Sequence, residues 1–70
     1  MNRLAVQSRE IAIIGYDDKT SKLEIAFRRG GVYRYLDVPE DIYKAFLSAE
    51  SHGSYFQDKI KDKFDFVKVS

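Results

Sequence analysis

The sequence predicts one α+β domain, in which a three-stranded antiparallel β-meander is followed by two short α-helices. In the first half of the chain apolar and polar residues alternate, as in half-buried strands, and turn-forming residues separate the alternating segments. In the second half apolar residues recur every three or four positions, which is the period of a helix. The chain has 70 residues and no cysteine, so its stability must come from packing and not from disulfides.

The first two strands are predicted on either side of a turn. Residues 10–16 are rich in β-branched side chains and stop at a cluster of turn formers, residues 17–21. Residues 22–28 then alternate between apolar and charged side chains, which is typical of a strand with one buried face. The apolar members of this second strand are Leu23, Ile25 and Phe27.

The first strand carries apolar side chains on both of its faces. In a regular strand Ile11 and Ile13 point to one face, while Ile14 and Tyr16 point to the other. Two short helices cover one face of a sheet well but not both. We therefore expect the second face to meet either the C-terminal tail or a partner subunit, as in a homodimer.

A third strand and a first helix are predicted from the turn formers that precede them. Gly30 and Gly31 supply the positive φ angles that hairpin turns need, and residues 32–38 continue as a strand. Proline is tolerated in a first helical turn, so a helix is expected to begin near Pro39 and to end near Gly53. Its apolar stripe consists of Ile42, Ala45, Phe46 and Ala49, widened by Tyr43 and Leu47.

A second, shorter helix is expected to begin near Ser54, because Phe56, Ile60 and Phe64 recur at every fourth residue. The tail, residues 64–69, alternates weakly and is either a short last strand or an extended segment docked on the domain. Residues 1–7 are expected to be a loosely ordered N-terminal segment. Residues 8–70 then form the single domain.

The composition restricts both the partners and the location of the protein. The net charge is +1, whereas proteins that bind nucleic acid mainly by neutralising phosphates carry a large positive excess, so any such binding must be local. Residues 1–6 lack the apolar stretch of a signal peptide, and the longest apolar run, residues 11–14, is too short to span a bilayer. We expect a cytoplasmic protein that does not bind membranes.

No pattern of catalytic or metal-ligating residues stands out. His52 has neither an evident nucleophile nor an orienting partner, which is typical of a capping or surface residue. Asp17 and Asp18 are adjacent in a turn, so their side chains point apart, and no third ligand accompanies them. The sequence therefore predicts no catalytic residue, no metal site and no cofactor, and the protein is not expected to be an enzyme.

Tyr33, Arg34 and Tyr35 form the candidate functional motif, because residues two apart in a strand project from the same face. An even hairpin loop of Gly30 and Gly31 would place both rings on the face opposite the core, beside Arg28 and Glu24. An odd loop of Arg29, Gly30 and Gly31 would instead set Phe27 opposite Tyr33 and Ile25 opposite Tyr35, with both rings in the core. The two alternatives differ by one residue of register.

Exposed tyrosines would suit a small binding module for RNA or a nucleotide. Aromatic faces stack on bases, and Arg28, Arg29 and Arg34 would hold the phosphates. The candidate binding residues are therefore Tyr33, Arg34, Tyr35, Arg28 and Arg29. The alternative function is a protein-protein interaction module, or a homodimer, that uses the same aromatic sheet face.

Several short motifs, taken in order along the chain, resemble the KTSC domain. They are Ile-Gly-Tyr-Asp at residues 14–17, Phe27, the glycine turn, Tyr-Arg-Tyr at 33–35, Val38-Pro39, Ala49, Ser51, Gly53 and Tyr55-Phe56, within residues 8–65. That family is named after the C-terminal domain of some lysyl-tRNA synthetases and has a central Tyr-x-Tyr motif. The resemblance implies a domain whose function is not established, with RNA binding suggested by the synthetases and with Tyr33 and Tyr35 as positions of interest.

Overall fold

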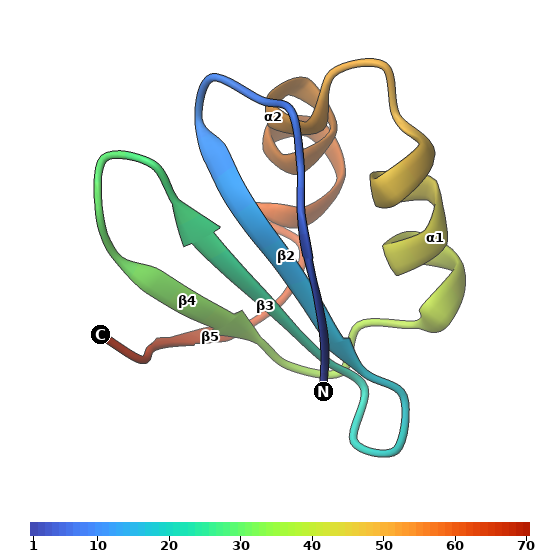
Figure 1. The fold of residues 1–70 in the computed structure, drawn as a ribbon. Helices are drawn as coiled ribbons and strands as arrows, with labels where there is room; N and C mark the ends of the chain where they lie inside the picture. Colours follow the sequence, from blue (N-terminus) through green and yellow to red (C-terminus); the bar gives the residue numbers. More distant parts are fainter.

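A five-stranded antiparallel sheet, in the order β1-β2-β3-β4-β5, forms the frame of the structure (Figure 1). The computed structural model describes residues 1–70. The strands are β1 (Asn2–Ala5), β2 (Ile11–Asp17), β3 (Lys22–Phe27), β4 (Val32–Tyr35) and β5 (Phe66–Lys68). The predicted meander of β2, β3 and β4 is confirmed, and the C-terminal tail is a strand that pairs with β4.

The helical segments lie between β4 and β5 in the chain and cover one face of the sheet (Figure 1). They are α1 (Glu40–Ser48), α2 (His52–Tyr55) and the π-helical turn η1 (Phe56–Ile60), which directly continues α2. The predicted α+β fold is confirmed. No helix is long and apolar enough to cross a membrane.

The boundary between the two predicted helices lies earlier than the glycine at position 53 suggests. Helix α1 ends at Ser48, and α2 begins at His52, with the Ser51 side chain accepting a hydrogen bond from the Ser54 amide at 3.2 Å. Gly53 is therefore inside α2 and does not end α1. It is buried beneath Glu10, whose carboxylate lies 3.4 Å from where a Cβ at Gly53 would be.

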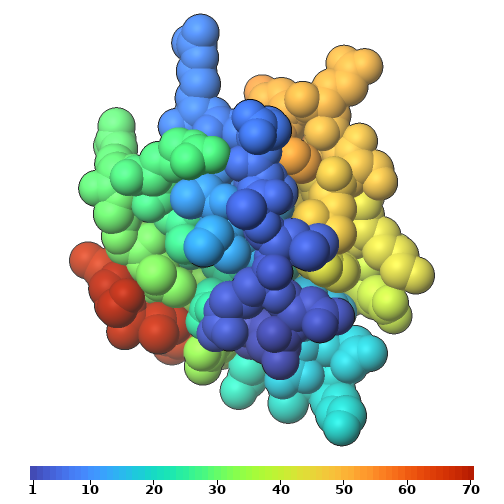
Figure 2. Space-filling model, in the orientation of Figure 1, coloured from blue at the N-terminus to red at the C-terminus, as the bar shows by residue number.

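The N-terminal segment contains a strand, where the sequence analysis expects a loosely ordered region. Residues Asn2–Ala5 pair with β2, with Leu4 opposite Ile14, and all four residues are exposed. In Figure 2 these residues, in dark blue, lie across the surface of the molecule. The segment is thus an edge strand, held to the domain mainly by its backbone pairing.

Strand β2 contains a β-bulge, and the prediction that Ile11 and Ile13 share one face is therefore wrong. The register shifts between Ile11 and Ile13, so that Ile11 pairs with Phe27 while Ile14 pairs with Ile25. Because the bulge inserts one residue, Ile11 and Ile14 both reach the helix-covered face and are completely buried. Ile13 is left on the open face, 38% exposed.

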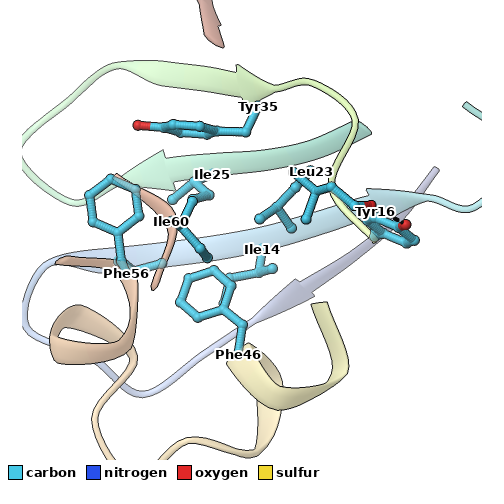
Figure 3. Close-up of a cluster of buried hydrophobic side chains, with 10 residues drawn as sticks. Ile14, Tyr16, Leu23, Ile25, Tyr35, Phe46, Phe56 and Ile60 are labelled. Carbon is cyan, nitrogen blue, oxygen red and sulfur yellow. Dashed lines mark hydrogen bonds between the residues drawn. The ribbon is translucent and has the colours of Figure 1, made fainter. Parts of the chain in front are cut away.

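The core lies between the sheet and the helices (Figure 3). Phe46 from α1 is completely buried, whereas Ala45, which the predicted stripe included, is exposed. Tyr16 closes one end of the core: its hydroxyl donates a 2.6 Å hydrogen bond to the Val38 carbonyl, and its ring stacks on Tyr43 at 4.5 Å between centroids. The completely buried side chains are Phe46, Ile11, Ile14, Leu23, Ile25, Ile60 and Val38.

Candidate aromatic binding cleft

The hairpin between β3 and β4 decides where the two tyrosines point. The Phe27 amide donates to the Gly31 carbonyl at 3.0 Å, so the loop holds the three residues 28–30, and Gly30 and Gly31 take φ angles of 115° and 93°. Ile25 consequently pairs with Tyr33. This odd loop puts both tyrosines on the core face. The alternative with both rings on the opposite face is therefore wrong. The pairing is shifted by two residues from the one predicted for an odd loop, in which Phe27 lies opposite Tyr33.

The tyrosines belong to a cluster of aromatic rings at the end of the core. Tyr35 is 4% exposed, whereas Tyr33 is half-buried nearer the edge of the sheet. Phe66 packs against both, with ring centroids 5.5 Å from Tyr33 and 5.3 Å from Tyr35. Such distances are typical of favourable aromatic pairs. The other rings of the cluster are Phe27, which meets Tyr33 edge-on, and Phe56, which meets Phe27 and Tyr35 edge-on.

These rings line a cleft of about 830 Å³ at the surface. The hairpin tip, the η1 segment with the turn that follows it, strand β5 and the loop before β2 form its walls. Its volume lies in the range of natural ligand sites. The lining residues are Arg9, Glu10, Phe27, Arg29, Gly30, Tyr33, Tyr35, Phe56, Gln57, Lys61, Asp62 and Phe66.

Charged groups of both signs surround the aromatic floor of the cleft. The cations are Arg9, Arg29 and Lys61, and the anions are Glu10 and Asp62. None of these five side chains forms an ion pair within the protein. The cleft therefore combines apolar stacking surface with charges that remain available to a ligand.

The hydroxyl of Tyr35 stays protonated over a wider pH range than that of a free tyrosine. Burial raises its pKa above the ordinary value of 10.0, and the neighbouring Tyr33 and Asp62 raise it further because negative charge nearby disfavours the phenolate. At neutral pH this hydroxyl is thus available as a hydrogen-bond donor, and it makes no hydrogen bond within the protein.

Arg34 and Arg28, two of the predicted binding residues, lie away from the cleft. Arg34 points to the open face of the sheet, where its Nη2 donates to the Glu24 carboxylate at 3.0 Å. Arg28 holds the segment between β1 and β2, because its guanidinium donates to the backbone carbonyls of Ser8 and Val6. Of the five residues that the sequence analysis selected, the structure brings together Tyr33, Tyr35 and Arg29.

Glu24 is the centre of an ion-pair ladder that crosses the open face. Arg3 on β1 bonds one carboxylate oxygen at 2.8 Å, and Arg34 on β4 bonds the other at 3.0 Å. Gly15 lies between Arg3 and Glu24 in the sheet, and a Cβ there would approach Cγ of Arg3 to 3.0 Å. The missing side chain lets Arg3 reach across β2.

The ionised form of Glu24 is favoured although its side chain is only 8% exposed. Burial alone would raise the pKa of this carboxyl, but the hydrogen bonds and charges of Arg34 and Arg3 outweigh that effect and hold the pKa below its ordinary value of 4.5. The ladder therefore has a structural role.

Sequence reasoning missed most of the residues that complete the cleft. The sequence predicts a helix at Phe56, and it predicts either a strand or a docked extended segment for the tail that contains Phe66. Arg9, Lys61 and Asp62 are distant from the tyrosines in sequence. The alternation of Phe64 and Phe66 is the signal that could have indicated Phe66, because it places an aromatic side chain beside the two tyrosines once the tail is paired with β4.

His52, the one histidine, makes a structural contact. Its Nδ1 lies 2.9 Å from the carbonyl oxygen of Phe46, close to the end of α1, and its ring meets that of Phe46 edge-on. The imidazole thus packs between α1 and α2, and His52 is not among the residues that line the cleft.

The chain is similar to small proteins of about its own length and to a short part of some lysine–tRNA ligases. A KTSC domain protein from Yersinia pestis has a crystal structure with a TM-score of 0.96 and 45% sequence identity, over 99% of this chain and 97% of that one. An uncharacterized protein from Stutzerimonas stutzeri is 39% identical over 61 residues, which are 87% of this chain and 86% of the relative. A lysine–tRNA ligase from Nostoc punctiforme is 40% identical over 55 residues, which are 79% of this chain but 10% of that enzyme. With residues 7–64 matching its profile, the chain belongs to the KTSC domain family.

Proposed function

We propose that this protein is a non-enzymatic binding module that holds single-stranded RNA in the aromatic cleft. The observation that carries the proposal is the joining of exposed aromatic surface to unpaired cations in one cleft. Phe66 is 50% exposed and Tyr33 is half-buried, so both present ring surface on which a base can stack. Arg9, Arg29 and Lys61 stand around these rings, where they suit the phosphates of the same strand.

The expected affinity is modest. Each stacked base contributes about 1–3 kcal/mol, and the cleft has room for only a small number of nucleotides. The net charge of +1 gives little long-range attraction, so the local cations must provide the electrostatic part of the binding. Recognition of unpaired bases is favoured over duplex binding, because the bases of a duplex are already stacked and inaccessible to the rings.

The relatives support RNA as the class of ligand. A domain similar to this chain forms a small part of proteins that are lysine–tRNA ligases, in Nostoc punctiforme and in Trichormus variabilis. Those enzymes act on an RNA. The chain covers 10% of each, so the ligase activity is not carried over to it.

The test is an NMR titration of the protein with short single-stranded RNA oligonucleotides. We expect chemical-shift changes at Arg29, Tyr33 and Lys61, and these changes should fade as salt is added. Replacing Lys61 with alanine should weaken binding and lower the dependence of log Kd on log salt concentration by about one unit. The matched control is Lys59→Ala, which removes an exposed lysine of η1 that does not line the cleft.

Two outcomes would contradict the proposal. Signals that stay unmoved with several RNAs would exclude RNA binding and leave a protein partner as the better reading of the aromatic cleft. Shifts that gather on the open face, around Arg3 and Arg34, would show RNA binding at a different surface.

A further inference from the structure

Two polar groups that line the aromatic cleft have no partner within the protein. They are the hydroxyl of Tyr35 and the carboxylate of Asp62. The Tyr35 side chain is otherwise buried, and its hydroxyl bonds no protein atom. Asp62 forms no ion pair, although Lys61 and Lys63 are its neighbours in sequence. The cleft thus offers a hydrogen-bond donor and a charged acceptor with two oxygens.

We propose that the cleft selects guanine, whose Watson–Crick edge is read by Asp62 and Tyr35. This inference rests on the proposed function, since it requires that a base enters the cleft. The carboxylate of Asp62 accepts hydrogen bonds from N1–H and from the N2 amino group, one on each oxygen. The hydroxyl of Tyr35 donates to O6, and the base lies against the exposed ring of Phe66.

The other bases do not match this arrangement. Guanine alone presents an acceptor followed by two adjacent donors along its Watson–Crick edge. Adenine and cytosine each place an acceptor nitrogen beside their one amino donor, and that acceptor would face a carboxylate oxygen. Uracil has one N–H between two carbonyl groups. One of these carbonyl oxygens would face the Asp62 oxygen that accepts from the N2 amino group of guanine. An unpaired acceptor against a carboxylate is unfavourable, so the site rejects these bases as well as attracting guanine.

The protonation state of Tyr35 suits this role. Burial and its neighbours raise the pKa of its hydroxyl, so the hydroxyl remains a donor at neutral pH. Asp62 is exposed, and each oxygen of its carboxylate can accept a hydrogen bond.

Selectivity is measured by titrating the protein with the 5′-monophosphates of guanosine, adenosine, cytidine, uridine and inosine, following chemical shifts. We expect guanosine monophosphate to bind about tenfold more tightly than the adenosine, cytidine and uridine nucleotides. Inosine monophosphate keeps O6 and N1–H but lacks the N2 amino group, so its affinity should fall between these limits.

Two variants assign the selectivity to its residues. Asp62→Asn keeps the shape of the side chain but turns one acceptor into a donor, and it should reduce the preference for guanosine to less than about threefold. Tyr35→Phe keeps the buried ring and should weaken guanosine binding without changing uridine binding to the same degree. The control is Asp58→Asn, an exposed carboxylate of η1 outside the cleft, which should leave the preference intact.

The outcomes separate this inference from the proposed function. Equal binding of all five nucleotides would overturn guanine selection but leave an RNA-binding cleft in place. Absence of binding by every nucleotide and by RNA oligonucleotides would overturn both. A guanine preference that survives in Asp62→Asn would overturn the role of this carboxylate.

Discussion

Replacement of Tyr35 by alanine is expected to destabilise the protein by about 3–5 kcal/mol, which is the usual cost of truncating a buried large aromatic residue. The ring is 4% exposed and packs against Phe56 and Phe66, while its strand lies between β3 and β5. Small domains have a total stability of about the same size, so much of the variant should be unfolded at room temperature. Urea unfolding followed by circular dichroism measures the effect.

The neighbouring tyrosine provides the comparison. Tyr33→Ala should cost clearly less, because Tyr33 is half-buried at the cleft, and this variant should remain folded. Tyr35→Phe should keep most of the stability, since its hydroxyl bonds no protein group. If Tyr35→Ala unfolded at the same urea concentration as the wild type, the packing described for β4 would be wrong.

Replacement of Glu24 by glutamine is expected to cost about 2 kcal/mol at neutral pH. Removing one partner of a buried ion pair costs about 3–5 kcal/mol, and the figure is reduced here because Arg3 and Arg34 keep side-chain exposures of 54% and 32%. The substitution preserves the shape of the side chain but leaves two arginines without their counter-charge. Urea unfolding at pH 7 measures the difference from the wild type.

The same variant should change how stability depends on pH. The folded-state pKa of Glu24 is lowered below 4.5, so its ionised form stabilises the protein fully above the unfolded pKa. That contribution is lost as the pH falls through the lowered folded pKa. The stability gap between wild type and Glu24→Gln should therefore be constant near neutral pH and should shrink on acidification from about pH 5 downward.

A surface carboxylate supplies the control for this pH effect. Glu40 pairs with Lys44 along α1 with both side chains largely exposed, so Glu40→Gln should leave the acid part of the stability profile nearly unchanged. A gap between wild type and Glu24→Gln that kept its full size at pH 2 would show that the ion pairs are not its source.

The fold class could be predicted because the spacing of apolar residues within a short segment indicates whether that segment forms a strand or a helix. Alternation over 22–28 predicts a strand, and the spacing of Phe46 from its apolar neighbours predicts a helix facing the sheet. The bulge in β2 could not be seen in this way. Ile11 and Ile14 are three residues apart, and only an inserted residue in the pairing brings both to the core.

The candidate site could be predicted only in part. The pair Tyr33 and Tyr35 was identified because two aromatic residues on one face of a strand are notable in any register. Its partners in the cleft come from distant segments, and Phe66 is placed beside them by the pairing of β5 with β4. The edge strand β1 is not predicted either. Its residues are exposed and it is held by backbone hydrogen bonds, so its sequence shows no hydrophobic periodicity.

The amino-acid sequence was sufficient to predict the fold class and the family resemblance and to select Tyr33 and Tyr35 as candidate residues, since each depends on motifs of residues close together in the chain. The face that the tyrosines occupy depended on one residue of hairpin register, which is settled by the packing of Leu23 and Ile25 beneath the helices. The separation of Arg34 from the cleft follows from the same register, because neighbouring residues of a strand point to opposite faces. Side-chain identity is local, whereas the direction in which a side chain points is decided by all the strands that pair with its own.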